Sequence, residues 1–266
     1  MLQLNGISFG YPGQTPIFQD FTWQVQRGET WAILGPSGCG KSTLLYLLAG
    51  LRFPKTGNVL VNNQIVERPR PQSGLIIQEY GLLPWATVRQ NAELGLRVRR
   101  FYGPDGKHAP EELKSATSVD PWLDRLRLLP HADKYPSQLS GGQRQRSAIA
   151  RTLALEPDLL LMDEPFSSLD APTREDLQTL TLELQNEQNL TLLIVTHSIE
   201  EAAVIGKKIL LLGHPPNSSP QVFENPGAGS SDFRESDEYA EICRILRQQM
   251  GTGNNAASLA NDGGQE

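Results

Sequence analysis

Short apolar runs separated by turn residues occupy the first part of the chain. Between Leu2 and Leu34 these runs are interrupted repeatedly, a pattern typical of strands and hairpins; the interrupting residues include Gly10, Pro12, Gly13 and Gly28. Residues 31–34 are then continuously apolar and predict a buried strand, and the leucine-rich residues 42–49 predict a helix that ends at Gly50. We therefore expect β-structure first, followed by a strand, a glycine-rich loop and a helix.

Apolar and charged stretches alternate along the rest of the chain. Strands are expected at 58–61 and 75–77, after which residues 88–129 lose strand character and predict an inserted helical subdomain with a solvated loop at about 103–118. Beyond Ser140, strands and helices alternate, which predicts a parallel sheet with helices on its faces. These strands are expected at 159–162, 191–195 and 209–212, and the helices at 142–155, 173–187 and 232–250. The small polar residues from 251 onward predict a disordered tail.

Composition narrows the possible partners and locations. The net charge of -6 at pH 7 leaves no broad basic surface for a nucleic acid, so no nucleic-acid partner is expected. The longest apolar stretches fall far short of the ~20 residues that a membrane-spanning helix needs, and the first residues lack the pattern of a secretory signal. The protein is therefore expected to stay in the cytoplasm. Cys39 and Cys243 stand far apart without metal-type spacing and are expected to be reduced thiols.

A phosphate-binding pattern follows the first buried strand. Its small residues allow backbone N–H groups to turn toward nucleotide phosphates, and the following helix points its positive end at them. We expect Lys41 to reach the β- and γ-phosphates, and the Ser42 hydroxyl to ligate Mg²⁺. The residues that fit the pattern are Gly35, Pro36, Ser37, Gly38, Cys39, Gly40, Lys41 and Ser42.

Two adjacent carboxylates end a later apolar strand. Residues 159–162 lead into Asp163 and Glu164, which places both acids at the carboxyl edge of a sheet, where ligands of open α/β folds bind. Asp163 is expected to hold Mg²⁺, directly or through water. Glu164 is expected to polarise the water that attacks the γ-phosphate, a general-base role that contributes ~10²–10⁴ in rate. Together with the phosphate-binding loop, these acids predict ATP hydrolysis.

A third motif carries a family resemblance. Residues 139–146, Leu-Ser-Gly-Gly-Gln-Arg-Gln-Arg, precede a predicted helix, so Ser140 can cap the helix while its N-terminus faces an anion. This run resembles the signature motif of ABC ATPases, and it stands in the family's order between the phosphate-binding loop and the Asp-Glu strand. The resemblance covers residues 2–212 and implies an α/β fold. Its parts are a P-loop NTPase core with a mainly parallel sheet, an N-terminal antiparallel β subdomain and an α-helical subdomain inserted at about 84–140, followed by a short C-terminal extension over 213–250 and the tail over 251–266.

The resemblance also implies site residues for ATP. Tyr11 matches the aromatic residue that stacks on adenine, and Thr43 joins the residues that bind ATP. Gln78 matches the Q-loop glutamine, which can ligate Mg²⁺ and sense the γ-phosphate. His197 matches the switch histidine, which can hydrogen-bond that phosphate and hold Glu164 and the attacking water in line.

Family members pair head to tail, so that each ATP lies between one subunit's phosphate-binding loop and the other's signature. The resemblance therefore implies a second ATPase chain, identical or paralogous, and it places Asp170 in a D-loop formed by 167–170. The signature residues expected to contact ATP of the partner subunit are Ser140, Gly141, Gly142 and Gln143.

The resemblance further implies two membrane-spanning permease subunits, contacted through the segment 78–85. Residues 82–85, 163–166 and 169–174 resemble importer ATPases of the nitrate, sulfonate and taurine group. An ATP-hydrolysing subunit on the cytoplasmic face of the membrane is therefore expected, together with an extracytoplasmic solute-binding protein. Ser168 departs from the alanine of many relatives, and 103–118 is longer than expected.

Two alternatives remain open. The chain can instead serve an exporter or a lipid transporter, because the ATPase core barely distinguishes direction. It can also be a soluble ABC ATPase of translation, DNA repair or iron–sulfur assembly, although it lacks the paired ATPase domains of translation factors and the long coiled coils of repair ATPases. The solute cannot be read from the sequence, because the solute does not touch this subunit.

Some titratable residues match no motif of the family. His108, His131 and His214 are expected to be solvated or structural. Lys55, Arg68 and Arg70 are expected to be surface charges.

Overall fold

The computed structural model of the chain describes residues 1–102, 118–230 and 232–261 and consists of two compact units. The first unit comprises Met1–Pro69 and Gln185–Glu266, and the second comprises Arg70–Leu184. The boundary falls within α5 (Ala171–Gln188). Apart from Ser118, the loop predicted over 103–118 lies outside the described residues, as do the last five positions of the predicted tail, 262–266.

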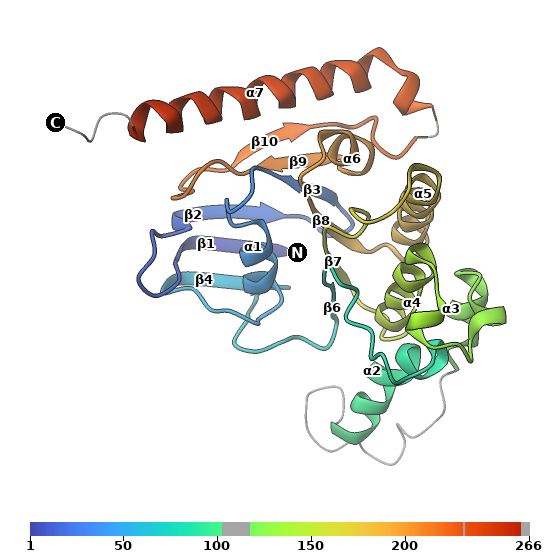
Figure 1. Cartoon of the computed structure of the whole chain (residues 1–266). Helices are drawn as coiled ribbons and strands as arrows, with labels where there is room; N and C mark the ends of the chain where they lie inside the picture. Colours follow the sequence, from blue (N-terminus) through green and yellow to red (C-terminus); the bar gives the residue numbers. More distant parts are fainter. Residues whose placement is uncertain (103–117, 231, 262–266) are drawn as a thin grey trace. The chain divides into compact units, whose positions relative to one another are not determined.

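An antiparallel sheet forms one layer of the first unit, in the order β2-β1-β4-β5. Its strands are β1 (Leu2–Phe9), β2 (Phe18–Val25), β4 (Thr56–Val61) and β5 (Gln64–Ile65). Buried residues alternate with exposed ones along β1 and β2 because one face of the sheet packs on the core. The antiparallel β subdomain predicted for the N-terminal part is confirmed (Figure 1).

Parallel strands form the second sheet of the first unit. β3 (Thr30–Leu34) lies between β8 (Thr191–Thr196) and β9 (Lys208–Leu211), parallel to both, and β10 (Gln221–Glu224) pairs antiparallel with β9. Every residue of β3 and β8 is buried, which explains the continuous apolar runs at 31–34 and 192–195. Leu34 pairs with Thr196 on one side and with Leu211 on the other. The chain therefore leaves all three parallel strands at one edge of this sheet.

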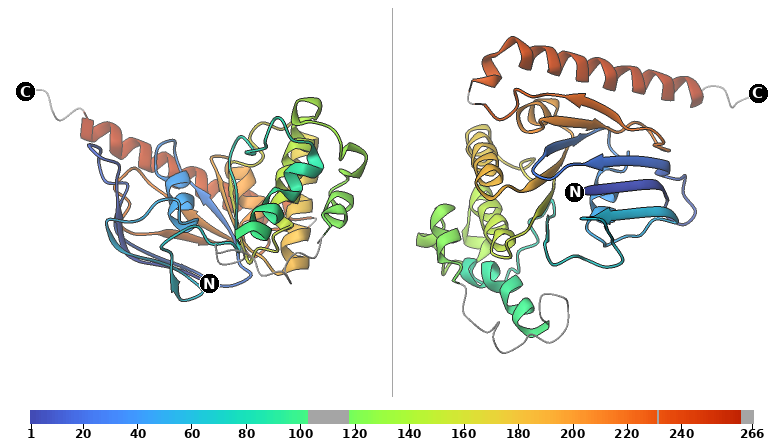
Figure 2. Two further views of the ribbon diagram at one scale, coloured as in Figure 1. Left: turned by 90° about the horizontal axis from the view of Figure 1, so that it is seen from below. Right: turned by 180° about the vertical axis from the view of Figure 1, so that it is seen from behind.

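The helices of the first unit are α1 (Lys41–Leu48), α6 (Ile199–Ile205) and α7 (Asp237–Asn261), with a 3-10 turn, η4 (Phe233–Glu235), before α7. Figures 1 and 2 show α7 running alongside β9 and β10. Its side chains Ile242 and Leu246 share a hydrophobic cluster with Ile209 and Leu211 of β9.

The end of α7 differs from the sequence prediction. A helix was expected over 232–250 and a disordered tail from 251, but α7 continues to Asn261. The small residues that suggested disorder include several alanines, and alanine has the highest intrinsic preference for the helix. The prediction of the tail is therefore wrong for residues 251–261.

The second unit contains a parallel pair of strands, β6 (Ser73–Ile76) and β7 (Leu159–Asp163). Its helices are α2 (Val88–Tyr102), α3 (Asp120–Arg125), α4 (Gly141–Leu153) and the first part of α5, with 3-10 turns η2 (Leu129–His131) and η3 (Pro136–Gln138). Because this unit includes both strands, it covers a longer part of the sequence than the helical subdomain predicted over 84–140.

A half-buried ion pair stands before β6 and β7. The Arg70 guanidinium donates to both carboxylate oxygens of Asp158, over 2.7 and 2.6 Å. Arg70 was expected to be a surface charge, but only 17% of its side chain is exposed. The expectation failed because the partner lies far along the chain, next to the strand that pairs with β6.

Within the described residues of both units, no helix combines the length and the apolar character that crossing a bilayer requires.

Candidate functional site

The phosphate-binding loop spans the gap between β3 and α1 in the first unit. Gly38 and Gly40 have φ of 76° and 107°, a region that side chains other than glycine rarely adopt. A Cβ on Gly40 would lie 2.3 Å from the Cγ2 of Ile17, so glycine is required there by space as well. The loop ends at the first residue of α1, whose free N–H groups and dipole favour an anion.

The Lys41 ammonium is held inside this loop. Its Nζ donates to the carbonyl oxygens of Gly35 and Pro36 over 2.8 and 2.9 Å, and the residue is only 7% exposed. A buried ammonium is stable only with such partners. The loop therefore keeps a positive charge at the place where the sequence predicts phosphates.

Cys39 lies within 4.0 Å of the same ammonium and is almost fully buried. Burial raises the pKa of its thiol, although the charge of Lys41 acts in the opposite direction. Burial also raises the pKa of the Cys243 thiol in α7. Both cysteines are free, in agreement with the reduced thiols expected from the sequence.

Tyr11 lies beside the start of α1. Its hydroxyl is 3.4 Å from the Thr43 Oγ1, and its ring meets Phe9 edge to face at 5.3 Å. The aromatic residue predicted to stack on adenine and the first turn after the loop are therefore neighbours in the first unit.

His197 follows the last residue of β8 and is exposed. Because Leu34 and Thr196 pair in register, Gly35 and His197 leave the sheet side by side at its carboxyl edge. The first unit therefore assembles three of the predicted parts, namely the phosphate-binding loop, Tyr11 and His197.

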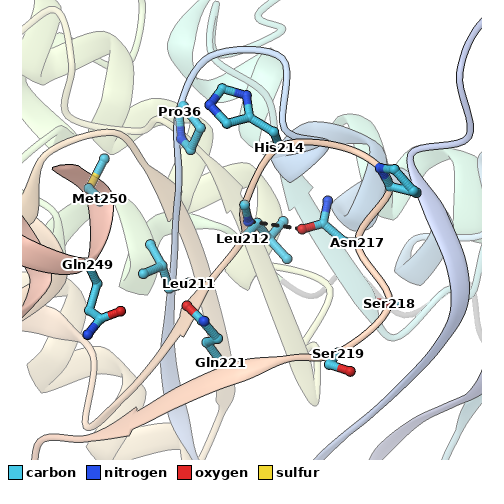
Figure 3. Close-up of a pocket in the computed structure, with 12 residues that line it drawn as sticks. Pro36, Leu211, Leu212, His214, Asn217, Ser218, Ser219, Gln221, Gln249 and Met250 are labelled. Atoms are coloured by element: carbon cyan, nitrogen blue, oxygen red, sulfur yellow. Dashed lines mark hydrogen bonds between the residues drawn. The ribbon is translucent and has the colours of Figure 1, made fainter. Parts of the chain in front are cut away.

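Asn217 contacts the phosphate-binding loop and was missed by the sequence analysis. It is 7% exposed, and its Nδ2 donates to the Cys39 carbonyl over 3.0 Å and to Ile17 over 3.3 Å, while its Oδ1 accepts from Gly213 over 2.9 Å. Figure 3 shows this residue in the wall of a cavity of about 410 Å³ that Pro36 also lines. Asn217 comes from the segment after β9, so the sequence near the loop does not predict its contact with the loop.

Replacing Asn217 by Leu should weaken nucleotide binding about tenfold, because the buried Cys39 carbonyl loses its donor and the loop its anchor. The measurement is titration with a fluorescent ATP analogue. Asn225 provides a matched control, since its Nδ2 donates to the carbonyls of Ala203 and Gly206, both at 2.8 Å, away from the loop. Asn225→Leu should lower the melting temperature and leave nucleotide affinity unchanged. Equal affinities for both variants would show that Asn217 only supports the fold.

In the second unit, β7 delivers Asp163 as its last residue and Glu164 immediately afterwards. Asp163 is 5% exposed, and Glu164 has a φ of 46°, which is uncommon for a residue with a side chain and costs of order 1–3 kcal/mol. The Glu164 carbonyl accepts from the N–H and the hydroxyl of Ser167. A tight turn therefore holds the predicted general base directly at the end of the strand.

Gln78 lies at the same edge of the strand pair as these acids. Ile76 pairs with Met162, so Gln78 and Asp163 both stand just beyond the last paired residues of β6 and β7. An amide oxygen and a carboxylate oxygen are ligands that Mg²⁺ accepts. Among the described residues no three His, Cys, Asp or Glu side chains are grouped to hold a metal.

The turn after Gln78 is bonded to the D-loop. The Tyr80 hydroxyl lies 2.7 Å from the Ser168 Oγ, and the Arg151 guanidinium donates to the carbonyl oxygens of Tyr80 and Gly81. An alanine at 168 would lack this bond. The departure at Ser168 thus ties the Q-loop turn to the D-loop.

The signature residues begin α4. Ser140 caps the helix, because its Oγ accepts from the Gln143 N–H and its own N–H donates to the Gln143 Oε1. A Cβ on Gly142 would lie 2.5 Å from the Thr173 Cγ2, so only glycine allows this approach to α5. Asp170 caps α5 by accepting from the Thr173 N–H over 2.9 Å, and the hydrogen bonds from Thr173 lower the pKa of its carboxyl. The second unit thus brings the signature and the D-loop together.

The chain is similar to known proteins in sequence and in structure. The family profile described as ABC transporter matches residues 18–167. A taurine import ATP-binding protein of Yersinia pestis is 38% identical over 93% of this chain and 91% of its own. An aliphatic sulfonates import ATP-binding protein of Bacillus cereus is 34% identical over 95% and 96%. Among solved structures, a dimeric ATP-binding cassette in a post-hydrolysis state with ADP and Pi has a TM-score of 0.67 and 28% identity, covering 84% of this chain and 98% of the cassette.

Proposed function

The chain belongs to the ABC transporter family, and on this basis we propose that it is the ATP-hydrolysing subunit of an importer for small sulfonate-type solutes. The similarity to taurine and sulfonate import proteins over more than nine tenths of the chain is the observation that carries the proposal. The alternatives, an exporter or lipid transporter and a soluble ABC ATPase, are outcomes of the test below.

ATP binds in the first unit under this proposal. The N–H groups of residues 35–43 surround the β- and γ-phosphates, and Lys41 exchanges its carbonyl partners for phosphate oxygens, which form stronger charge-assisted bonds. Tyr11 offers its ring face to adenine. A Mg²⁺ ion, when bound, supplies positive charge for the phosphates, and Ser42, Gln78 and Asp163 are the residues that would hold it.

Hydrolysis then depends on Glu164 and His197. Glu164 accepts a proton from water as the water oxygen bonds to the γ-phosphorus and the bond to the β-phosphate oxygen breaks, which yields ADP and phosphate. His197 donates a hydrogen bond to the γ-phosphate and keeps the water in line. Gln78 senses whether the γ-phosphate is present, because the position of the Gln78 side chain depends on the ligands around it.

The second copy of the ATPase subunit completes each site. Ser140, Gly141, Gly142 and Gln143 direct their helix N-terminus at the nucleotide of the partner chain, and Asp170 lies at the same junction. ATP therefore joins two subunits, and loss of the γ-phosphate releases them.

Among the described residues, Trp85 is the most exposed large apolar residue, and it is suited to receive the permease. Trp85 is 73% exposed. A tryptophan buries more apolar area than most residues when a partner covers it, so an exposed one is typical of an interaction surface. It belongs to the segment that joins Gln78 to α2. Two permease subunits docked here would hold the protein at the cytoplasmic face of the membrane, and an extracytoplasmic binding protein would deliver the solute.

Truncating Trp85 to Ala should weaken permease binding at least about tenfold, since buried tryptophans are frequent hot spots of interfaces. Purified subunit would be titrated onto permease in detergent, with ATPase activity of the free subunit as a second readout that should not change. Phe53→Ala is the control, because Phe53 is also exposed, at 49%, but lies in the first unit. Full permease binding by the Trp85 variant would move the docking surface elsewhere.

The function itself is tested by purifying the tagged chain from detergent-solubilised membranes and identifying its companions by mass spectrometry. A multi-spanning permease together with a solute-binding protein is the expected result. A permease without a binding protein would favour an exporter or a lipid transporter. Recovery of soluble proteins or ribosomes alone would overturn the transport role and leave the ATPase assignment intact.

A further inference from the structure

The first turn of the signature helix is held by two reciprocal hydrogen bonds. The Ser140 N–H donates to the Gln143 Oε1 over 3.0 Å, and the Ser140 Oγ accepts from the Gln143 N–H over 3.3 Å. The hydroxyl hydrogen of Ser140 is not used by either bond, so it remains available to a phosphate oxygen. The orientation of the Gln143 amide therefore determines how Ser140 is oriented toward a phosphate.

The imidazole of His131 contacts the other end of this amide. The Nε2 of His131 lies 3.0 Å from the Nε2 of Gln143. A backbone N–H can only donate, so the Gln143 oxygen must face Ser140 and its NH₂ group must face His131. The His131 Nε2 is therefore the acceptor of this hydrogen bond.

This role determines the tautomer of His131. An imidazole that accepts at Nε2 carries its proton on Nδ1 when neutral. The Nδ1 of His131 is buried and has no hydrogen-bond partner among the described residues, so no contact there selects the tautomer. The bond from Gln143 is thus the one polar contact of the ring that the described residues provide.

The backbone on both sides keeps the ring in place. His131 ends η2, its N–H donates to the Leu128 carbonyl over 2.8 Å, and its carbonyl accepts from the Lys134 N–H over 3.0 Å. A short hydrogen-bonded turn therefore fixes the acceptor before α4 begins.

We propose that His131 is a positioning residue for the signature motif, which holds the Gln143 amide so that Ser140 and the N-terminus of α4 are set for the nucleotide of the partner subunit. From its sequence context, His131 was expected to be solvated or structural, because no family motif includes it. The functional part of the proposal rests on the proposed function, in which the signature closes on a second subunit's ATP.

Two substitutions separate this role from simple packing. His131→Gln keeps an acceptor at about the reach of Nε2, whereas His131→Asn is equally polar but too short. In His131→Asn, the amide of Ser140 should exchange with deuterium about 3- to 10-fold faster than in the parent, and His131→Gln should restore the parent rate. Gln138→Leu is the matched control, because Gln138 makes a similar amide cap to the Tyr135 N–H in η3.

ATP-driven dimerisation provides the functional readout, measured in a Glu164→Gln background to prevent turnover. His131→Asn should raise the dimer dissociation constant about fivefold and leave nucleotide affinity of the single subunit unchanged, while His131→Gln and Gln138→Leu should dimerise like the parent. Unchanged exchange at Ser140 in His131→Asn, or equal defects in the Asn and Gln variants, would overturn the proposal. A parent that does not dimerise with ATP would instead refute the proposed function, and the exchange result would still decide the role of His131.

Discussion

Glu164→Gln should bind ATP with the parent affinity, lose about 10²–10⁴ in turnover and accumulate as an ATP-bound dimer. The amide keeps the shape of the side chain and can still hold water by a hydrogen bond, but it cannot accept the proton that the attacking water releases. Because the γ-phosphate then persists, the contacts that favour the dimer persist with it. Phosphate release and size-exclusion chromatography with and without ATP measure the two effects.

Glu187→Gln is the control for this experiment, since Glu187 is an exposed carboxylate on α5. It should hydrolyse ATP like the parent and show no trapped dimer. A Glu164→Gln variant that turns over at the parent rate would remove Glu164 from the catalytic role, and the tight turn at its positive φ would then need another explanation.

Lys41→Ala should lower ATP affinity by at least about 100-fold. Charge-assisted hydrogen bonds contribute roughly 1.5–3 kcal/mol each, and the ammonium is expected to make two of them to phosphate oxygens. In the protein without ATP, the substitution also leaves the carbonyls of Gly35 and Pro36 without their donor. Titration with a fluorescent ATP analogue measures the loss.

Lys55→Ala controls for a general effect of lost positive charge, because Lys55 is exposed in the same unit. Its affinity for ATP should equal that of the parent. Unchanged affinity in Lys41→Ala would contradict the assignment of Lys41 to the phosphates, whatever the fold of the loop.

The parts of the fold that depend on local pattern were predictable. β3 and β7 are buried on both faces, so their sequences are continuously apolar, and their ends are marked by glycine or by acids. The helix α6 was not predicted, although its signal was present. Ser198 stands at its start and accepts from the Glu201 N–H, the spacing of a capping box.

The contacts that connect distant segments were not predictable in the same way. Asn217 bonds to the Cys39 carbonyl and Tyr80 to Ser168, in each case across a long stretch of chain. One sequence gives the residue types on both sides but not the approach between them. Taken alone, Tyr11 would have been interpreted as a packing residue and His197 as a histidine at the end of a strand. The family resemblance supplied their predicted roles.

The buried thiol in the phosphate-binding loop has a consequence for chemical labelling. Alkylating reagents attack the thiolate, and burial of Cys39 both raises its pKa and excludes the reagent. Modification at this position therefore requires the loop to open first. The rate of alkylation at Cys39 therefore measures how fast the loop opens. Mass spectrometry can follow this rate without any engineered label.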